Sequence, residues 1–348
     1  MGGELNISLS AIAANYRYLC LQATGQVAAV VKADGYGLGA VPIARKLLGE
    51  GCREFFVATL TEGVNLRQAI PDAIIYVLEG AEAETVSELC RAELTPVLNT
   101  ERQCQCWKTT GRSAAVHIDT GMQRLGLSPV TAQSVIGRNE LRLDLVISHF
   151  ARADETGHAS LQRQVDQVVP IFRGLQAHFP NLRLSLCNSA ALLQGLGPES
   201  LGRAGIGLYG ANPSDQPENP MQSVVEMLGR VLQIRALDEG VAVGYGGSFV
   251  TRKKTRLAVL GVGYADGIPR LLSNRGVVAL SGQRCPIVGR VSMDSMTVDV
   301  TGLAVAEGDA IEVIGSTVSV DEVAGWAQTI SYEVLCGLSR RLPRHYAD

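Results

Sequence analysis

Short apolar segments recur along the chain from residue 26 onwards, and each is followed by a polar or amphipathic segment of helical length. Such short runs of β-branched and small apolar residues are typical of strands buried on both faces of a parallel sheet. The pattern predicts eight strands, at residues 27–32, 55–60, 73–78, 94–98, 114–119, 143–149, 183–187 and 204–209. Helices are expected between them, at 41–48, 62–69, 82–91, 101–108 and 161–179.

Eight strands that alternate with helices over about 200 residues predict a (β/α)8 TIM barrel, an α/β fold. Functional groups of such barrels lie in the loops at the carboxyl ends of the strands. A doubly wound open sheet is the alternative, but no Gly-x-Gly-x-x-Gly opens any of the predicted helices.

The pattern changes after residues 212–220, where three prolines in nine residues predict a linker. Beyond it, strands are expected at 256–262, 276–280, 296–300 and 310–314, and a helix only at 321–327. The sequence therefore predicts a barrel domain over residues 1–215 and a mainly β domain over 216–348. The first few residues are also candidates for the second domain.

Composition narrows the class of protein. Apolar residues make up 46% and charged residues 19% of the 348 positions, as in a globular enzyme. The net charge of −3 predicts no attraction to nucleic acid or to an anionic membrane. No apolar run reaches the length of a membrane span, and Met1 to Glu4 lack the basic start of a signal peptide. The eight cysteines show no metal-ligand spacing, so we expect free thiols and a cytoplasmic protein.

Lys32 stands at the end of the first predicted barrel strand, followed by a glycine-rich turn. A lysine at this edge is partly desolvated, which lowers its pKa and makes it a usable nucleophile. Tyr36 follows among glycines, where its hydroxyl and nearby backbone N–H groups can approach a phosphate. A solvated strand end is the simpler interpretation of a lysine taken alone.

The full string at residues 30–39, Val-Val-Lys-Ala-Asp-Gly-Tyr-Gly-Leu-Gly, resembles the pyridoxal-phosphate lysine motif of the alanine racemase family. It departs from the usual family motif at Gly35, where alanine is common, and at Leu38, where histidine is common. The resemblance implies pyridoxal 5'-phosphate held on Lys32, with Tyr36 among its ligands.

The fifth predicted strand leads into Asp-Thr-Gly-Met-Gln-Arg at residues 119–124, which resembles a second family string. In the family its arginine contacts the phenolic oxygen of the cofactor and the substrate carboxylate, which assigns Arg124 to both. Many members carry a carbamylated lysine that orients this arginine, but His117 occupies that position here. We therefore expect a bound anion or a direct hydrogen bond to orient Arg124.

The ends of the sixth and seventh predicted strands and the start of the eighth resemble further family strings. The resemblance implies that the cofactor-binding residues there are His149, Asn188, Ser189, Arg203, Gly205 and Ile206, with Ser189 on the phosphate. Phosphate sites at the last two strands are common in TIM barrels. Arg203 would stand at the pyridine nitrogen, where most enzymes with this cofactor place a carboxylate. Because arginine stays charged and only donates, it keeps that nitrogen unprotonated and disfavours a long-lived carbanion.

The second domain carries three more strings that resemble the family. They imply that Tyr264 is the second catalytic base, that the backbone N–H of Met293 binds the substrate carboxylate, and that Tyr332 lies on the cofactor phosphate at the substrate entrance. Tyr264 and Met293 would act in the other subunit of a head-to-tail homodimer. An unperturbed tyrosine titrates near 10, so cationic neighbours must lower the pKa of Tyr264, and His149 and Arg203 are the candidates.

Together these strings imply an enzyme that interconverts L-alanine and D-alanine by a two-base mechanism with Lys32 and Tyr264, and that supplies D-alanine for peptidoglycan. A racemase that prefers serine or accepts several amino acids shares the motifs. A decarboxylase of the same barrel class would need an acidic partner for the ring nitrogen, and Arg203 argues against it. A non-catalytic pyridoxal-phosphate carrier would need neither Tyr264 nor the second domain.

Overall fold

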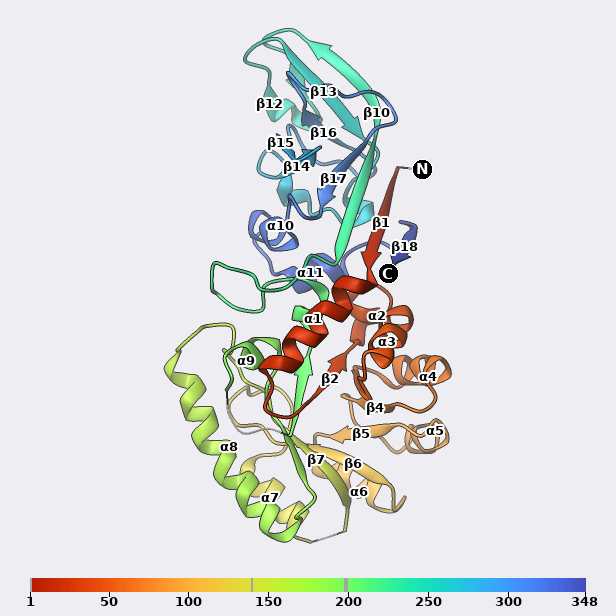
Figure 1. The fold of residues 1–348 in the computed structure, drawn as a ribbon, viewed down its shortest axis with the longest axis vertical. Helices are drawn as coiled ribbons and strands as arrows, with labels where there is room; N and C mark the ends of the chain where they lie inside the picture. The colour runs from red at the N-terminus through yellow and green to blue at the C-terminus, as the bar shows by residue number, and fades with distance from the viewer. Residues whose placement is uncertain (1, 139, 197–199) are drawn as a thin grey trace.

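The computed structural model describes residues 2–138, 140–196 and 200–348. Two domains are stacked along one long axis, a barrel of strands and helices and a mostly β domain (Figure 1). Positions 1, 139 and 197–199 of the predicted first domain lie outside the described residues. The domain boundary near residue 215 stays a prediction, although the segment around it has no regular secondary structure.

The barrel consists of eight parallel strands. They are β2 (Gln26–Val30), β3 (Glu54–Val57), β4 (Ile74–Val77), β5 (Thr95–Leu98), β6 (Ser113–His117), β7 (Arg142–Ile147), β8 (Arg183–Ser185) and β9 (Leu201–Ala204). They run β8-β7-β6-β5-β4-β3-β2-β9, and the backbone N–H of Arg203 donates to the Cys187 carbonyl across the seam at 2.9 Å. The predicted barrel is confirmed and the open sheet is wrong.

The eighth strand differs from the prediction. β9 ends at Ala204, and Ile206–Tyr209 forms a 3-10 turn, η1, instead of continuing the strand. Gly205 leaves the extended region with φ −119° and ψ −107°, and Ser189 Oγ accepts hydrogen bonds from the Gly205 and Gly207 amides. The apolar residues of 206–209 are buried in a turn, a case that an apolar run alone does not distinguish from a strand.

Helices cover the barrel strands. They are α2 (Lys32–Tyr36), α3 (Ala40–Gly49), α4 (Leu60–Ala69), α5 (Val86–Arg91), α6 (Glu101–Lys108), α7 (Pro129–Gly137), α8 (Ala159–His178) and α9 (Ser189–Leu193). Of the predicted helices, the one at 82–91 begins only at Val86. The sequence missed α7, although Ser128 caps its first turn and Pro129 occupies a favoured first position.

The second domain is built on one sheet with the order β15-β14-β17-β10-β1-β18, to which β13 and β16 are joined through β10. Its strands are β1 (Gly3–Ser8), β10 (Val225–Leu237), β13 (Thr255–Leu260), β14 (Val277–Leu280), β15 (Gln283–Pro286), β16 (Met296–Asp299), β17 (Ala310–Ile314) and β18 (Arg344–Ala347). A separate hairpin contains β11 (Ala242–Val243) and β12 (Phe249–Val250). Strands predicted at 256–262, 276–280, 296–300 and 310–314 are confirmed.

The two ends of the chain lie side by side in this sheet. β1 pairs antiparallel with β10 and parallel with β18, so residues 3–8 and 344–347 belong to one layer. α1 (Leu9–Gln22), which the sequence did not predict, then runs down to the barrel (Figure 1). The first residues therefore contribute a strand to the second sheet.

Two helices of the second domain face the barrel. α10 (Val320–Trp326) confirms the prediction at 321–327, and Ser319 and Glu322 form its capping box. The expectation of a single helix is wrong, because α11 (Ser331–Cys336) follows and packs against α2. Six residues are too few for a helical period to stand out in the sequence. Across the described ranges, no helix has the length and apolar content needed to cross a bilayer.

Candidate active site

Lys32 lies where the first barrel strand ends. β2 ends at Val30, and the Val31 amide still donates to the Phe56 carbonyl of β3, so Lys32 is the second residue beyond the strand. Burial lowers the pKa of the Lys32 amine, and the nearby guanidinium groups of Arg124 and Arg203 lower it further. A larger fraction of this amine is therefore neutral and nucleophilic than in a solvated lysine.

The chain after Lys32 winds into a left-handed helical turn. Residues 33–37 all have positive φ, between 52° and 83°, and the Gly37 amide closes the turn on the Ala33 carbonyl at 2.8 Å. Ala33, Asp34 and Tyr36 carry side chains in this conformation, which costs roughly 1–2 kcal/mol for each. Gly35, one of the two departures from the family motif, has φ 63° and removes that cost at its own position.

Glu62 supports the start of this turn. One carboxylate oxygen accepts from the Ala33 amide at 2.8 Å, and the other accepts from the Ala58 amide at 2.7 Å. Glu62 also closes the capping box of α4 with Thr59. We did not predict this role, although the Thr-x-x-Glu spacing at residues 59–62 is a capping signal visible in the sequence.

Tyr36, Ser189 and Gly205 meet at the mouth of the last strands. Ser189 Oγ accepts from the Gly205 amide at 2.8 Å and the Gly207 amide at 3.2 Å. A Cβ on Gly205 would lie 2.7 Å from the Tyr36 hydroxyl, so only glycine allows this approach. Burial raises the pKa of Tyr36, which therefore stays protonated and can donate. Two hydroxyl groups and a turn rich in backbone N–H groups form a cradle suited to an anion.

Asn188 and Ile206 lie beside this cradle. The Asn188 side chain caps α9 by accepting from the Ala191 amide at 3.0 Å, so its contact in the structure is to the backbone. Ile206 is buried and opens the η1 turn between the two amides that Ser189 binds. Asn188 thus fixes where Ser189 begins its helix.

Arg203 is buried and hydrogen-bonded to His149. The guanidinium donates to the Ser185 carbonyl at 2.8 Å, the Ser148 carbonyl at 2.7 Å and the Nδ1 atom of His149 at 3.1 Å. Burial lowers the pKa of His149 to about 3, with a further contribution from the Arg203 charge. His149 is therefore neutral, and because Nδ1 accepts, Nε2 carries the hydrogen. The expectation of a cationic His149 is wrong, because burial and the Arg203 charge disfavour its protonated form.

His117 is the last residue of β6, the fifth barrel strand, and Arg124 lies in the loop that follows it. Arg124 is exposed, and its charge acts on Lys32, His117 and His149. His117 Nδ1 lies 2.9 Å from Asn99 Oδ1, while the Asn99 amide nitrogen donates to the Leu78 and Val97 carbonyls. The Asn99 oxygen is thus the acceptor, so His117 is protonated on Nδ1 and offers a lone pair on Nε2.

The second domain brings Tyr332 to the same region through α11. Its ring centroid lies 5.8 Å from that of Tyr36, which itself stacks on Tyr209 at 4.4 Å. Burial raises the pKa of Tyr332 to about 12, and the charge of Asp154 adds to the effect. Cys336 on the same helix lies close enough to Lys32 for each to influence the pKa of the other. Sequence reasoning did not single out this thiol.

Tyr264 and Met293 lie together in the second domain. The Tyr264 amide donates to the Ser292 carbonyl at 3.0 Å and the Ala265 amide to the Met293 carbonyl at 2.9 Å. Their side chains are exposed, at 43% for Tyr264 and 53% for Met293. Neither residue is among the groups that shift the pKa of Lys32 or His149 in the same chain. The structure therefore places these two predicted residues on an open surface.

Asp266 and Asp294 connect the two turns that carry Tyr264 and Met293. Arg341 donates to the buried Asp266 carboxylate at 2.7 and 3.1 Å and to Asp294 at 2.8 Å. Asp266 also accepts from the Gly263 amide next to Tyr264 at 2.8 Å. One guanidinium thus ties the turn of Tyr264 to the turn of Met293.

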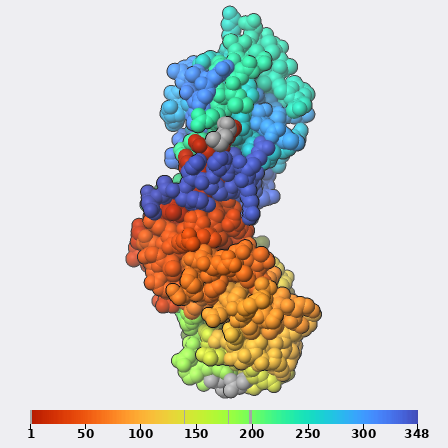
Figure 2. All heavy atoms as spheres, turned by 90° about the vertical axis from the view of Figure 1, so that its right-hand side faces the viewer, coloured from red at the N-terminus to blue at the C-terminus, as the bar shows by residue number. Residues whose placement is uncertain are grey.

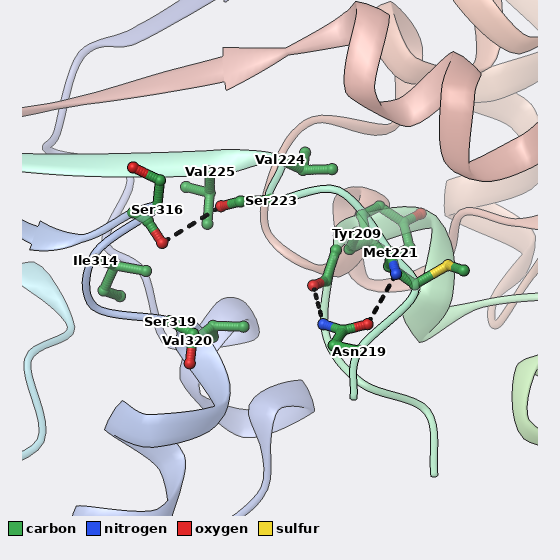
Figure 3. Close-up of a pocket in the computed structure, with 12 residues that line it drawn as sticks. Tyr209, Asn219, Met221, Ser223, Val224, Val225, Ile314, Ser316, Ser319 and Val320 are labelled. Carbon is green, nitrogen blue, oxygen red and sulfur yellow. Dashed lines mark hydrogen bonds between the residues drawn. The ribbon is translucent and has the colours of Figure 1, made fainter. Parts of the chain in front are cut away.

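A separate cavity of about 320 Å³ lies between the linker and the start of α10 (Figure 3). Asn219 crosses it by donating to the Gly210 carbonyl and accepting from the Met221 amide. Tyr209 lines it, while the ring of Tyr209 also stacks on Tyr36. None of the sequence-predicted site residues lines this cavity. Among the residues that the structure describes, no cluster of His, Cys, Asp or Glu could hold a metal ion.

Known proteins match the chain over nearly its whole length. The family model "Alanine racemase, N-terminal domain" matches residues 7–213, and "Alanine racemase, C-terminal domain" matches residues 224–346. The alanine racemase of Rhodospirillum rubrum is 40% identical over 98% of this chain and 95% of its own length. The catabolic alanine racemase of Rhizobium johnstonii is 41% identical over 99% of this chain and 94% of its own.

Solved structures agree with the sequence relatives. The crystal structure of alanine racemase from Bartonella henselae with covalently bound pyridoxal phosphate has a TM-score of 0.91 at 35% identity, and all of both chains is covered. That of the biosynthetic alanine racemase of Pseudomonas aeruginosa has a TM-score of 0.91 at 32% identity, covering 100% of this chain and 99% of the other. With both family models matched in order on one barrel and one β domain, this chain belongs to the alanine racemase family.

Proposed function

We propose that the protein is a pyridoxal-phosphate-dependent alanine racemase. The observation that carries the proposal is a desolvated amine, Lys32, on the same barrel edge as the Tyr36, Ser189 and Gly205 cradle. An aldehyde cofactor with a phosphate group needs both, a nucleophilic amine and an anion site. Membership of the family supplies the reaction, because the matched relatives are named for alanine racemisation.

The residues present fit this cofactor. Lys32 would hold its aldehyde carbon, Tyr36 and Ser189 would donate to its phosphate beside the Gly205–Ile206 backbone, and Arg203 would face its ring nitrogen. Asn188 would position Ser189, and His149 would act beside Arg203. When bound, pyridoxal phosphate supplies an electron sink for the charge left after an α-proton is removed from an amino acid.

Arg203 sets the character of the site. Arg203 is 6% exposed, and its guanidinium donates to the Ser185 and Ser148 carbonyls, so the orientation of this group is fixed. It does not lose its proton at any pH the protein meets, and therefore it never offers an acceptor to a protonated ring nitrogen. This argues against the decarboxylase alternative, which requires an acidic group there.

Two proton carriers on opposite faces of the substrate complete the mechanism. The Lys32 amine would remove or return the α-proton on one face. We assign the other face to Tyr264 of a second copy, with the Met293 N–H and Arg124 on the substrate carboxylate. Support comes from the exposure of Tyr264 and Met293 and from their absence among the groups acting on Lys32 in one chain. The protein would thus be a homodimer with composite sites.

His117 excludes a carbamylated lysine beside Arg124. Its Nε2 lone pair is an acceptor that a guanidinium can use, and a bound anion is the other way to orient Arg124. Mass spectrometry should find the peptide containing residue 117 unmodified. A modification on that residue would contradict this assignment.

The substrate test compares kcat/KM for alanine and serine in both directions. We expect alanine to be preferred, because Tyr332 limits the pocket and a hydroxyl group needs room or a partner. Equal or better values with serine would support the broader racemase. Borohydride treatment of the yellow holoenzyme should fix the cofactor on Lys32, and a colourless protein that gains no racemase activity when supplied with the cofactor would overturn the proposal.

The cellular role that we propose is supply of D-alanine for peptidoglycan in the cytoplasm. The cysteines of the described residues form no disulfide, which is compatible with a reducing compartment. Because some matched relatives are called catabolic, deletion of the gene decides the role. A strain that requires D-alanine for growth supports the biosynthetic role, and a strain that grows without it but cannot use alanine as a nutrient supports the catabolic one.

A further inference from the structure

The left-handed turn after Lys32 has an unusual neighbour in the second domain. The segment of residues 338–346 crosses directly over it, and Figure 2 shows this dark-blue part of the chain lying against the red and orange start of the barrel. The two segments are 307 residues apart in the chain at the Arg344–Gly37 contact.

Arg344 is the main contact. Its Nε and Nη2 atoms both donate to the Gly37 carbonyl, at 3.2 and 3.0 Å, where the left-handed turn ends. The same guanidinium donates to the carbonyls of Leu338, Ser339 and Leu342 at 3.1 to 3.2 Å. Arg344 thus joins its own segment to the turn through one planar group whose direction is fixed from both sides.

Tyr346 makes a second contact, to Leu38, the residue after Gly37. Its hydroxyl donates to the Leu38 carbonyl at 2.9 Å. A Cβ on Gly39 would lie 2.1 Å from that hydroxyl, and a Cβ on Gly37 would lie 2.5 Å from the Leu335 carbonyl of α11. These two glycines therefore permit the close approach of the second domain, in addition to their positive φ values of 83° and 100°.

We infer that the 338–346 segment holds the strained turn in place, with Arg344 and Tyr346 as positioning residues for Lys32. A run of left-handed residues persists only where surrounding contacts fix it, and these are contacts from outside the turn. The inference uses the proposed function only where it takes Lys32 as the cofactor lysine.

The test measures hydrogen exchange of the amides at residues 37–39 in the cofactor-loaded protein. Exchange should rise about fivefold in Tyr346→Phe, which loses one hydrogen bond, and about tenfold or more in Arg344→Gln. Asp348→Asn is the matched control, because Asp348 lies two residues beyond Tyr346 and pairs with Lys46, which is outside the turn. If both variants exchange like Asp348→Asn, the segment does not hold the turn and the inference is wrong.

A second readout separates positioning from general stability. With alanine as substrate, kcat should fall about tenfold in Arg344→Gln with KM changed less than twofold, because misplacing a reacting amine affects the chemical step. Arg344→Lys should recover part of the exchange protection, since one ammonium cannot bridge four carbonyls. Faster exchange with unchanged kcat would overturn the positioning role. Tyr346→Phe, which removes a single oxygen, keeps the test usable if Arg344→Gln fails to fold. The exchange result stands even if the protein racemises no alanine.

Discussion

His117 shows how a single residue inside the barrel is fixed. It is 8% exposed, its Nδ1 hydrogen is donated to Asn99, and its ring lies 3.2 Å from where a Cβ on Gly126 would stand. Gly126 has φ 115°, so both backbone and space demand glycine there. Burial, with the positive charge of Arg203, lowers the pKa of His117 to about 4. The imidazole therefore stays neutral at the pH of a cell.

This shift predicts an acid dependence of stability. The unfolded chain protonates His117 near pH 6.5 and the folded one only near 4, so the unfolded state binds more protons between these values. Stability should fall on acidification through this window, with up to about 1.4 kcal/mol per pH unit from this residue. Denaturant unfolding of His117→Gln should show a slope against pH that is smaller by this amount. An unchanged slope in His117→Gln would refute the shift.

At this scale the sequence predicted the residues that stand at strand ends. Lys32 and His149 follow apolar runs, and parallel strands bring such positions to one edge. Arg203 precedes the apolar run predicted at 204–209 and lies within β9, so only the family resemblance pointed to it. Glu62, Arg344 and Tyr346 were not found, because their contacts are to backbone groups of distant segments. A hydrogen bond to a carbonyl 307 residues away leaves no local pattern.

Among the elements, α4 and the left-handed turn form one unit through Glu62. Its carboxylate caps the helix and also accepts from the Ala33 amide. The helix that follows the second barrel strand thus positions the residue next to Lys32. The negative charge of Glu62 also acts to raise the pKa of Lys32 against the larger effect of burial.

Glu62→Gln should weaken this unit. The amide nitrogen of glutamine would face a backbone N–H that now has an acceptor, which leaves a donor unsatisfied and costs about 1–3 kcal/mol. The pKa of Lys32 should fall further, since a nearby carboxylate is lost. Denaturant unfolding measures the first effect, and the pH dependence of Lys32 labelling measures the second. Glu84→Gln, an exposed change, should alter neither; a Glu62→Gln protein as stable as wild type would contradict the role.

The sequence predicted most strands whose apolar run had the length of a strand. It did not predict β1 or β10, and it wrongly predicted a strand at residues 206–209. β1 and β10 pair with each other although more than 200 residues separate them, so each is a strand because of a distant partner. Residues 206–209 are as apolar as a strand but form the η1 turn, because Ser189 Oγ accepts hydrogen bonds from the Gly205 and Gly207 amides. Such cases are decided by tertiary contacts rather than by local pattern.

The whole molecule is long, with the barrel at one end and the exposed Tyr264 and Met293 on the other domain (Figure 1). Arg341 keeps these two turns together through Asp266 and Asp294. In the function that we propose, this surface of the second domain and the mouth of the barrel are the two halves of one active site. A second copy in head-to-tail orientation would join them.

Co-expression tests whether the halves come from different chains. Lys32→Ala and Tyr264→Phe should each be inactive alone, but a mixed dimer contains one site with both native residues. Random pairing then restores about a quarter of the wild-type activity, since half of the dimers are mixed and one of two sites works in each. The double variant co-expressed with wild type is the control and should contribute nothing in mixed dimers. Failure to restore activity would place both residues in one chain.

The contact of Arg344 with Gly37 also bears on how the protein is made. Gly37 leaves the ribosome 307 residues before Arg344 reaches it, and at about 5 to 20 residues per second this is a delay of roughly 15 to 60 s. During that time a nascent barrel has its lysine but not the side chains that steady it. If Arg344 positions Lys32 as we infer, we expect the coenzyme to bind only after the last strand of the sheet has been translated.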